Sequence, residues 1–433
     1  MPTSMAQRLR RRAAAFRQRP LVREGLWVVA GHGVTAVAGL VSIRLFTELA
    51  PQSVFGAANL LLGMLTLGMH ALLAPITQTQ IRYHSAYNDA GDGDAYTRLI
   101  ARLAAGAAAA IIVLVSAALL LWPGARGGAG LSVIGWLAAW VGVSAWRGVL
   151  INRAQAERQQ KRFALWVGTE ALLTMGCTGG TLALWPTVEG FIAGQVMGLA
   201  IAALIFGSPA FLRAGPPIGA DMKRVVFSRV ATYGLPFAPL SVLGWVSNLS
   251  ERYILVAYFD TATVGLYVAA FAIANRLPQI PSNFLADLLR PVLFEAQGRG
   301  QFIVVRKVIM TWLSGLTLIA ALSIAVVIQF GDLIAYLLLE ATYRAPAIQL
   351  MPWIVGSAIA TTFTMALDQY LMSHGRSRVL LIPKTIAPAA SLACSVALIP
   401  QYGLVGAALA HFAGQAAQLL TTILLVAALR RPN

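Results

Sequence analysis

Charged residues are scarce in this sequence. Only 11% of its 433 residues are Asp, Glu, Lys or Arg, whereas 58% are hydrophobic and the mean hydropathy is +0.72. An ordinary soluble domain carries about 25% charged residues. A chain this apolar cannot cover a water-exposed surface of its own size, so a soluble globular protein is excluded.

Cysteines and catalytic signatures are also nearly absent. Cys177 and Cys394 are the only cysteines, and both lie in apolar runs, which favours neither a disulfide framework nor a metal site. No Walker A motif, no HExxH and no GxSxG occurs. No segment between the apolar runs is long enough to form a catalytic domain. We therefore expect no enzyme activity, no catalytic residue, no metal and no cofactor.

Long apolar runs dominate what is present. Leu26–Phe46 and Val308–Phe330 each exceed the roughly 20 residues that a helix needs to cross about 30 Å of hydrocarbon. Ala and Leu dominate the runs and strand-like alternation is absent, so the spans are helices. We expect twelve, at about residues 25–47, 54–80, 99–122, 131–153, 163–185, 189–208, 229–258, 263–294, 306–329, 345–372, 378–399 and 402–428.

Basic residues predict the orientation of these spans. The connections after the odd-numbered spans hold almost no Lys or Arg, with Arg126 and Arg344 as exceptions, whereas the other connections are basic. The positive-inside rule places the basic connections and both termini on the cytoplasmic side. The net charge of +17 therefore mostly reflects topology, and nucleic acid is not an expected partner. We expect the basic segment 1–24 to precede an uncleaved first span and to contact anionic lipid.

The two halves of the chain repeat at a nearly constant offset. At offsets of 208 or 209 residues, the first-half residues Arg44, Gly56, Arg82 and Arg98 match Arg252, Gly265, Arg290 and Arg306. We predict a six-helix lobe over 25–208, a linker over 209–228 and a second six-helix lobe over 229–429. An even number of helices per lobe makes the repeats parallel, so two bundles can rock around a central site.

The eighth span carries the strongest set of candidate functional residues. Its polar residues fall within about 80° of one face and extend over roughly 21 Å: Arg276, Gln279, Asn283, Asp287 and Arg290. Pro278 and Pro281 predict a kink. Ionisable groups inside a membrane tend to face a cavity, and an Arg fork suits a phosphate anion. The alternative is that both arginines merely pair with Asp287 and nearby carbonyls.

Other acidic residues in the spans are candidates for ion coupling. Glu251 in the seventh span could bind a coupling proton, or it could only pair with Arg252. Glu170 lies at the depth of Arg147, and Asp368 lies at the depth of Lys384, which favours structural pairs between helices over proton-coupled switching. Asp287 is a further candidate. His411 in the last span is expected to form an interhelical hydrogen bond.

The second half contains a motif series: Tyr233-Gly234-Leu235-Pro236, Glu251-Arg252-Tyr253, Val264-Gly265-Leu266-Tyr267 and Arg290-Pro291-Val292-Leu293. This series resembles the polysaccharide biosynthesis (O-antigen flippase-like) family of the multidrug/oligosaccharidyl-lipid/polysaccharide (MOP) exporter superfamily. Glu251 stands where that family usually has Asp. The resemblance covers most of the chain and is best over residues 227–300.

The resemblance implies a MATE/MOP-like flippase in the bacterial inner membrane. It implies that an undecaprenyl-pyrophosphate-linked oligosaccharide moves to the periplasmic leaflet, coupled to H⁺ or Na⁺, with polysaccharide polymerase or export machinery as partners. Arg252 and Arg276 would attract the pyrophosphate, Arg82 and Arg290 would guard the cytoplasmic entrance, and Arg44 would mirror Arg252. A multidrug antiporter and a non-transporting scaffold of a polysaccharide assembly complex remain alternatives.

Overall fold

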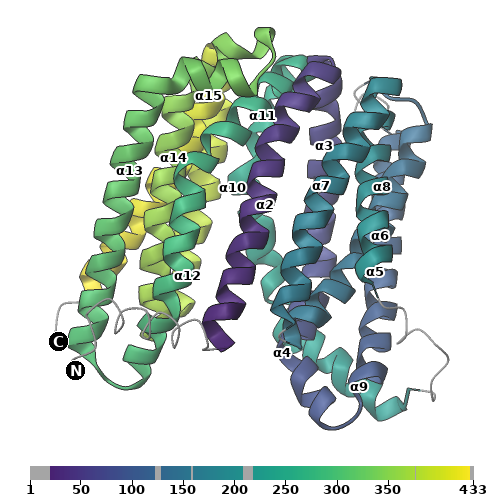
Figure 1. Ribbon diagram of the computed structural model, residues 1–433, viewed down its shortest axis with the longest axis vertical. Coiled ribbons are helices and arrows are strands. Elements are labelled where there is room, and N and C mark those ends of the chain that lie inside the picture. Colours follow the sequence, from purple (N-terminus) through teal and green to yellow (C-terminus); the bar gives the residue numbers. More distant parts are fainter. Residues whose placement is uncertain (1–19, 122–127, 158, 208–217, 376, 430–433) are drawn as a thin grey trace, which may run out of the picture.

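The runs of Ala, Leu and Val form long helices, because only helices or closed barrels satisfy every backbone group in hydrocarbon. The structure is a computed structural model that describes residues 20–121, 128–157, 159–207, 218–375 and 377–429. Helices account for nearly all of these described residues, and no strand occurs among them. Figure 1 shows two groups of helices side by side, which we call the first and second helix groups.

The first helix group contains α2 to α8. Its helices are α2 (Pro20–Leu49), α3 (Gln52–Gly68), α4 (Ala74–Asp89), α5 (Gly93–Leu121), α6 (Ser132–Ala156), α7 (Gln160–Leu184) and α8 (Val188–Phe206). A π-helical turn, η1 (Met69–Leu73), joins α3 to α4. Within the group, α7 packs along both α2 and α8.

The second helix group contains α9 to α15. Its helices are α9 (Ala220–Arg229), α10 (Phe237–Tyr258), α11 (Thr261–Ala274), α12 (Arg276–Gly298), α13 (Phe302–Leu338), α14 (Ala341–Ser373) and α15 (Leu381–Leu429). The short turns η4 (Val230–Gly234) and η5 (Ser377–Leu380) precede α10 and α15. Helix α9 occupies part of the segment expected to be a linker.

The expected all-α membrane fold is confirmed. Eight helical segments in the described part are long and apolar enough to cross a membrane, and α9–η4 with α10 makes a ninth if that pair, bent by 43°, is one span. The count of twelve requires α7, the α11–α12 pair and the second half of α15 as well. Gly403 divides α15, because its φ of 53° lies in the left-handed region that favours glycine.

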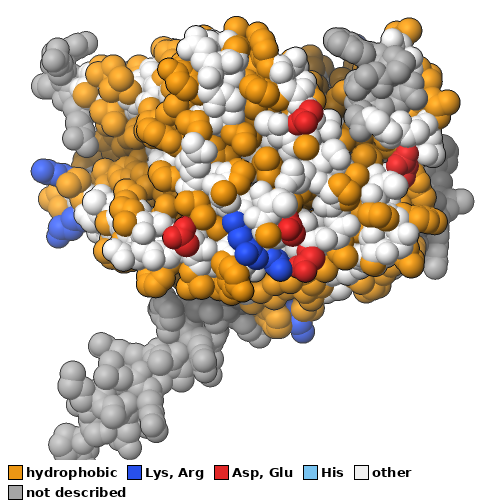
Figure 2. Space-filling view, turned by 90° about the horizontal axis from the view of Figure 1, so that it is seen from above, with side chains coloured by type: hydrophobic (Ala, Val, Ile, Leu, Met, Phe, Trp, Pro, Cys, Tyr) orange, Lys and Arg blue, Asp and Glu red, His pale blue; other side chains and the backbone are white. Residues whose placement is uncertain are grey.

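Among the described residues, one end of the molecule shows few basic side chains (Figure 2). We call it the upper end: it holds the α2–α3, α10–α11 and α13–α14 connections (Figure 1). Seen from above, this face is mostly apolar or uncharged, and few basic side chains are visible on it (Figure 2). The lower end holds the α4–α5 and α12–α13 connections together with α9, and it is the end that the charge pattern assigns to the cytoplasm.

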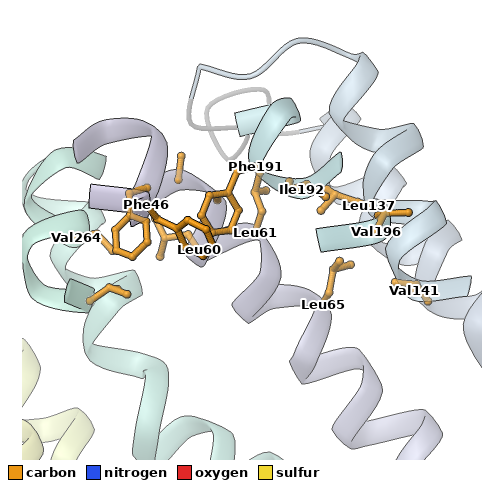
Figure 3. Close-up of a cluster of buried hydrophobic side chains, with 14 of the residues drawn as sticks. Phe46, Leu60, Leu61, Leu65, Leu137, Val141, Phe191, Ile192, Val196 and Val264 are labelled. Atoms are coloured by element: carbon orange, nitrogen blue, oxygen red, sulfur yellow. The ribbon is translucent and has the colours of Figure 1, made fainter. Parts of the chain in front are cut away.

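A buried apolar core near the upper end joins the two groups. Figure 3 shows Phe46, Phe191, Leu60 and Val264, which come from α2, α8, α3 and α11. The rings of Phe46 and Phe191 meet edge to face, with centroids 5.3 Å apart. Because Val264 belongs to the second helix group, the hydrophobic contact extends across the boundary between the groups.

The closest approach between the groups is a crossing of α3 and α11 near their first turns. A Cβ atom on Gly56 would lie 1.8 Å from the carbonyl oxygen of Thr261, and one on Gly265 would lie 2.2 Å from that of Gln52. Small residues at such crossings let helix backbones approach closely. Gly56 and Gly265 are one of the repeated pairs in the sequence, so equivalent positions of the two halves meet each other.

Candidate functional site

The α12 helix has three faces. The buried face, packed on α13 and α14, carries Pro278, Ser282, Ala286 and Leu293. The exposed apolar face carries Ile280, Phe284, Leu288 and Val292. At about 100° per residue, the polar stripe lies between these faces. It consists of Arg276, Gln279, Asn283, Asp287 and Arg290, as the sequence predicted.

Arg276 is positioned by the break between α11 and α12 at Asn275. Its guanidinium lies against α2: a Cβ atom on Gly39 would be 2.7 Å from Nη2 and 2.8 Å from Nη1. Nη1 is buried and has no hydrogen-bond partner among the described residues. A buried cationic donor without a partner carries a large free-energy cost, so this guanidinium is well suited to bind an anion at the boundary between the groups.

The polar side chains in the lower part of the stripe do not form ion pairs with one another. Asp287 is exposed, and within the described ranges it forms no ion pair with Arg276 or Arg290. Nε of Arg290 is buried without a hydrogen-bond partner there. Gln279 is half-buried and Asn283 is exposed. The alternative in which Asp287 neutralises both arginines is therefore absent from this conformation.

The two groups meet along two seams that the sequence repeat relates to each other. In the loose seam, α2 faces α12: α2 packs on α11 and α13, but lies apart from α12 along nearly all of its described length. In the tight seam, α3, η1 and α4 pack continuously on η4 and α10. The stripe of α12 therefore borders the loosely packed side of the boundary (Figure 1).

Aromatic side chains and one glycine hold the tight seam. Trp245 Nε1 donates to the carbonyl oxygen of Gly63 at 2.8 Å, and the Tyr253 hydroxyl donates to that of Leu60 at 2.8 Å. A Cβ atom on Gly234 would lie 2.3 Å from the carbonyl oxygen of Pro75. The Tyr233-Gly234-Leu235-Pro236 motif thus supplies the π-helical turn, the bend and the close contact with α4.

Glu251 lies in a fully buried polar cluster within the second helix group. Its Oε1 accepts a hydrogen bond from the Tyr267 hydroxyl at 3.3 Å and lies 3.6 Å from Nδ1 of His411. Oε2 has no hydrogen-bond partner in the described part of the chain. The expected Glu251–Arg252 pair is not observed: the Arg252 guanidinium instead lies 5.4 Å from the ring centroid of Phe271.

Sequence reasoning did not find the Glu251–His411 pairing. It placed Glu251 in the seventh span and His411 in the last, with no spacing signal to join residues 160 positions apart. One sequence feature could have indicated a buried polar partner in this region. Tyr267, in the Val264-Gly265-Leu266-Tyr267 motif, places a hydroxyl in an apolar helix, and a buried hydroxyl needs a hydrogen-bond partner.

Arg44 lies at the upper end, away from the α12 stripe. It forms an ion pair with Glu48 at 2.8 Å and donates to the carbonyl oxygen of Leu339 in the second group. Nearby, Gln52 donates to the Thr342 hydroxyl at 2.7 Å. We call these contacts between the groups the upper latch. A concavity of about 700 Å³ adjoins the latch, lined in part by Thr47, Glu48, Glu340, Thr342 and Tyr343.

Two residues outside the spans cap helices beside the latch. Glu340 accepts a hydrogen bond from the backbone N–H of Thr342 at 2.9 Å, and Asp260 accepts one from that of Thr263 at 2.8 Å. Hydroxyl donation from Thr342 and Thr263 adds to these bonds and holds the pKa of each carboxyl below its usual value. Both caps therefore favour charged carboxylates at the N-termini of α14 and α11.

Two of the acidic residues considered for ion coupling form ion pairs with basic side chains. Glu170 pairs with Nε of Arg147, and Asp368 accepts from Nζ of Lys384 at 3.1 Å. Each pair joins two helices within one group, as the matched depths predicted. In the described residues, no group of three or more His, Cys, Asp or Glu side chains could hold a metal ion.

Arg82 lies at the lower end of the tight seam, on the other side of the boundary from the α12 stripe. Its guanidinium carbon is 4.7 Å from the ring centroid of Tyr233, a residue of the second helix group. The structure therefore separates Arg82 from Arg276 and Arg290, which the sequence analysis had grouped together as substrate contacts.

Comparison with known proteins identifies the fold. The sequence matches no protein-family model and no curated protein. It is similar in structure to an inward-facing multidrug resistance MATE family transporter of the MOP superfamily (TM-score 0.71, 15% identity, 93% of this chain and 99% of that chain). An outward-facing structure of such a transporter gives a TM-score of 0.61, at 15% identity over 95% of this chain and 96% of that one.

A lipid flippase has the same architecture. The lipid II flippase MurJ in an inward closed conformation matches with a TM-score of 0.68, at 10% identity over 93% of this chain and 87% of that chain. These solved neighbours are transporters and flippases rather than enzymes. The chain therefore has the MATE/MOP transporter fold and is a multi-pass membrane protein, as expected from its sequence.

Proposed function

We propose that this protein is a flippase of the O-antigen flippase-like family, which moves an undecaprenyl-pyrophosphate-linked oligosaccharide across the bacterial inner membrane. The observation that carries the proposal is the buried Nη1 of Arg276, which has no hydrogen-bond partner among the described residues, at the start of the α12 stripe. The substrate's pyrophosphate binds this guanidinium, because a planar fork can donate two hydrogen bonds to phosphate oxygens at once.

The faces of α12 match the two parts of such a substrate. Polar side chains of the stripe, from Gln279 to Arg290, offer donors and acceptors to a charged, sugar-bearing headgroup. The adjacent exposed face, with Phe284 and Leu288, suits a hydrocarbon tail that stays in the bilayer. An ionised phosphate is costly to move through hydrocarbon, and a cationic polar path lowers that cost.

The loose seam supplies the entry route. With the upper latch closed and α2 apart from α12, a lipid-linked molecule enters laterally from the lower, cytoplasmic end. The higher TM-score against the inward-facing MATE structure than against the outward-facing one supports this assignment. Release into the periplasmic leaflet then requires the latch around Arg44 to open and the lower end to close.

Glu251 is the acidic group best placed for ion coupling. Glu170 and Asp368 already pair with Arg147 and Lys384, and Asp287 is exposed. Glu251 is fully buried, and its nearest basic group is His411, 3.6 Å from Oε1. A proton or Na⁺ at this carboxylate changes the charge balance where α10, α11 and α15 meet. Since α11 also forms the glycine crossing with α3, such a change acts directly on the contact between the groups.

The first experiment is depletion of the protein in its native host, with the leaflet distribution of undecaprenyl-linked oligosaccharide as the readout. We expect the oligosaccharide to accumulate in the cytoplasmic leaflet, with loss of surface glycan. When the depleted strain is complemented with Arg276→Gln at the wild-type protein level, surface glycan should be at least about tenfold lower than with the wild-type gene. Losing one charge-assisted pair of donors to the pyrophosphate weakens transition-state binding by more than about 1.4 kcal/mol.

Arg299→Gln is the matched control for Arg276→Gln. Arg299 lies just past the end of α12, is 65% exposed and pairs with Glu295 at 2.7 Å, outside the stripe. It should restore glycan fully. A normal leaflet distribution after depletion, in a host without a second flippase, would remove the proposal.

The second candidate is a multidrug antiporter. It is favoured by the MATE similarity and by the buried carboxylate of Glu251, since an acidic site suits a cationic drug. In that case Glu251→Gln should abolish drug resistance in an overexpressing strain, while surface glycan should remain normal in both Glu251→Gln and Arg276→Gln. A non-transporting scaffold would leave transport of both substrates unaffected by either variant.

A further inference from the structure

Two arginines and three tyrosines form a cluster at the lower end of the tight seam. The Arg82 guanidinium carbon lies 5.7 Å from the ring centroid of Tyr83 and 4.7 Å from that of Tyr233. The Arg229 guanidinium carbon lies 4.5 Å from the centroid of Tyr83 and 5.1 Å from that of Tyr87. We call these five residues the Arg–Tyr cluster. Arg82 comes from the first helix group and Arg229 from the second.

The cluster holds two cations close together without an anion. Because both guanidinium carbons lie near one Tyr83 ring, they are within about 10 Å of each other by the two distances to its centroid. Neither Arg82 nor Arg229 forms an ion pair with a carboxylate of the described residues, whereas Arg44, Arg147 and Arg299 all do. The Arg82 guanidinium hydrogen-bonds the Tyr83 and Tyr233 hydroxyls. A guanidinium has five N–H donors, so donors remain on it for a phosphate.

The depth of the cluster is that of lipid headgroups. Arg82 precedes the end of α4 at Asp89 by seven residues, which is about 10 Å of helix. Tyrosines concentrate at this boundary between water and hydrocarbon. Helix α9 beside it exposes the basic Lys223 and Arg224 together with the apolar Phe227, a combination that favours the surface of an anionic membrane.

We propose that the Arg–Tyr cluster binds the phosphate of an anionic phospholipid from the cytoplasmic leaflet. One phosphate there accepts hydrogen bonds from Arg82 and Arg229 and so ties α4 to the junction of α9 and η4. The lipid clamps the tight seam at its lower end, opposite the seam where α2 and α12 separate. The site is distinct from the α12 stripe, so it requires no particular transported substrate.

The test measures lipid binding to the purified, delipidated protein by native mass spectrometry during titration with phosphatidylglycerol or phosphatidylcholine. Phosphatidylglycerol should bind the wild type tightly. Arg82→Gln with Arg229→Gln should weaken that binding by about tenfold or more, since two charge-assisted contacts are lost. Lys223→Gln with Arg224→Gln, which removes equal charge from neighbouring exposed positions, should weaken it less than about twofold.

A second variant keeps the test valid if the glutamine pair fails to fold. Arg82→Lys with Arg229→Lys retains the charge and loses the planar fork, so it should bind phosphatidylglycerol with intermediate affinity. Equal losses in the cluster and control variants, or no loss in the cluster variant, would overturn the proposal in favour of unspecific surface charge.

Competition separates the possible sources of phosphate. Inorganic phosphate and phosphatidylcholine should leave bound phosphatidylglycerol in place, because neither supplies an anionic headgroup anchored in the leaflet. Displacement by inorganic phosphate would show a free-anion site instead. Preferential displacement by undecaprenyl pyrophosphate would overturn the phospholipid assignment and make the cluster an entry point for the transported lipid.

Discussion

The tight and loose seams are built from equivalent parts of the repeat but are packed in opposite ways. The 208-residue offset relates Arg82 on α4 to Arg290 on α12, and Arg44 on α2 to Arg252 on α10. In the tight seam, aromatic rings and Gly234 bring α4 against η4. In the loose seam, the corresponding helices present a polar stripe and remain apart. Similar backbones thus acquire different roles through a few side chains.

The difference teaches where movement can occur. A seam held by backbone-to-backbone approach and aromatic hydrogen bonds has little freedom, because close-packed contacts do not deform continuously. Between α2 and α12, the contact at Gly39 is with the end of the long, flexible Arg276 side chain, so these two helices can separate with little loss of packing. If the two groups rock as in the proposed flippase, the tight seam is expected to act as the hinge and the loose seam to open and close.

The glycine crossing joins α3 of the tight seam to α11, the helix that leads into α12 of the loose seam, so breaking it should have the largest effect. Gly56→Ala places a methyl group 1.8 Å from the backbone oxygen of Thr261, which cannot move without shifting α11. We expect a loss of about 3 kcal/mol in the free energy of unfolding or failure to accumulate folded protein. Thermal unfolding in detergent and expression level measure it. Gly106→Ala, at a position with open space, is the control and should behave like the wild type.

Matched glycine substitutions test the two seams directly. Gly234→Ala directs its methyl group at the backbone oxygen of Pro75, 2.3 Å away, and should cost about 2 kcal/mol. The atoms nearest a methyl group in Gly39→Ala belong to the end of the Arg276 side chain, which can swing aside, so the variant should cost less than about 1 kcal/mol while reducing transport. Unfolding midpoints and transport rates of both variants test whether the tight seam depends on close packing more than the loose seam does. Equal losses of stability would contradict the distinction between the seams.

Removing the Tyr253 hydroxyl measures how much one hydrogen bond contributes to the stability of the tight seam. Tyr253→Phe deletes the bond to the carbonyl oxygen of Leu60 and keeps the ring beside Trp245. We expect a loss of about 1 kcal/mol, the usual net worth of one hydrogen bond. Denaturation of the variant beside Tyr258→Phe, at an exposed tyrosine, isolates the contribution. If both variants unfold alike, the hydroxyl adds nothing to the seam.

The smallest expected effect concerns pH at the upper latch. Because the pKa of Glu340 is held below its usual value, the charged form is favoured in the folded state. Its stabilisation is present above the ordinary pKa, near 4.5, and is lost as pH falls through the lower folded pKa. Glu340→Gln should therefore unfold slightly earlier than the wild type at pH 7, and the difference should vanish in acid. A difference that persists in acid would assign the effect to packing instead.

Much of the site's polarity could be predicted from spacing alone. The residues from Arg276 to Arg290 were placed on one face because helical periodicity is a local property, and the structure keeps them there. The pairs Glu170–Arg147 and Asp368–Lys384 followed from equal depth in neighbouring spans. Glu251 with His411, and Arg44 with Leu339, could not be predicted, because those contacts join distant segments.

The sequence by itself determined that this chain is an all-helical membrane protein and that the polar residues of its eighth span share one face. Those properties depend on composition and on periodicity within one helix, and the bilayer restricts the outcome further. Only the tertiary structure decided which seam is tight, that Gly56 meets Gly265, and that Arg82 and Arg276 lie at different seams. Such facts depend on how closely helices approach, which is set by the shapes of residues far apart in the chain.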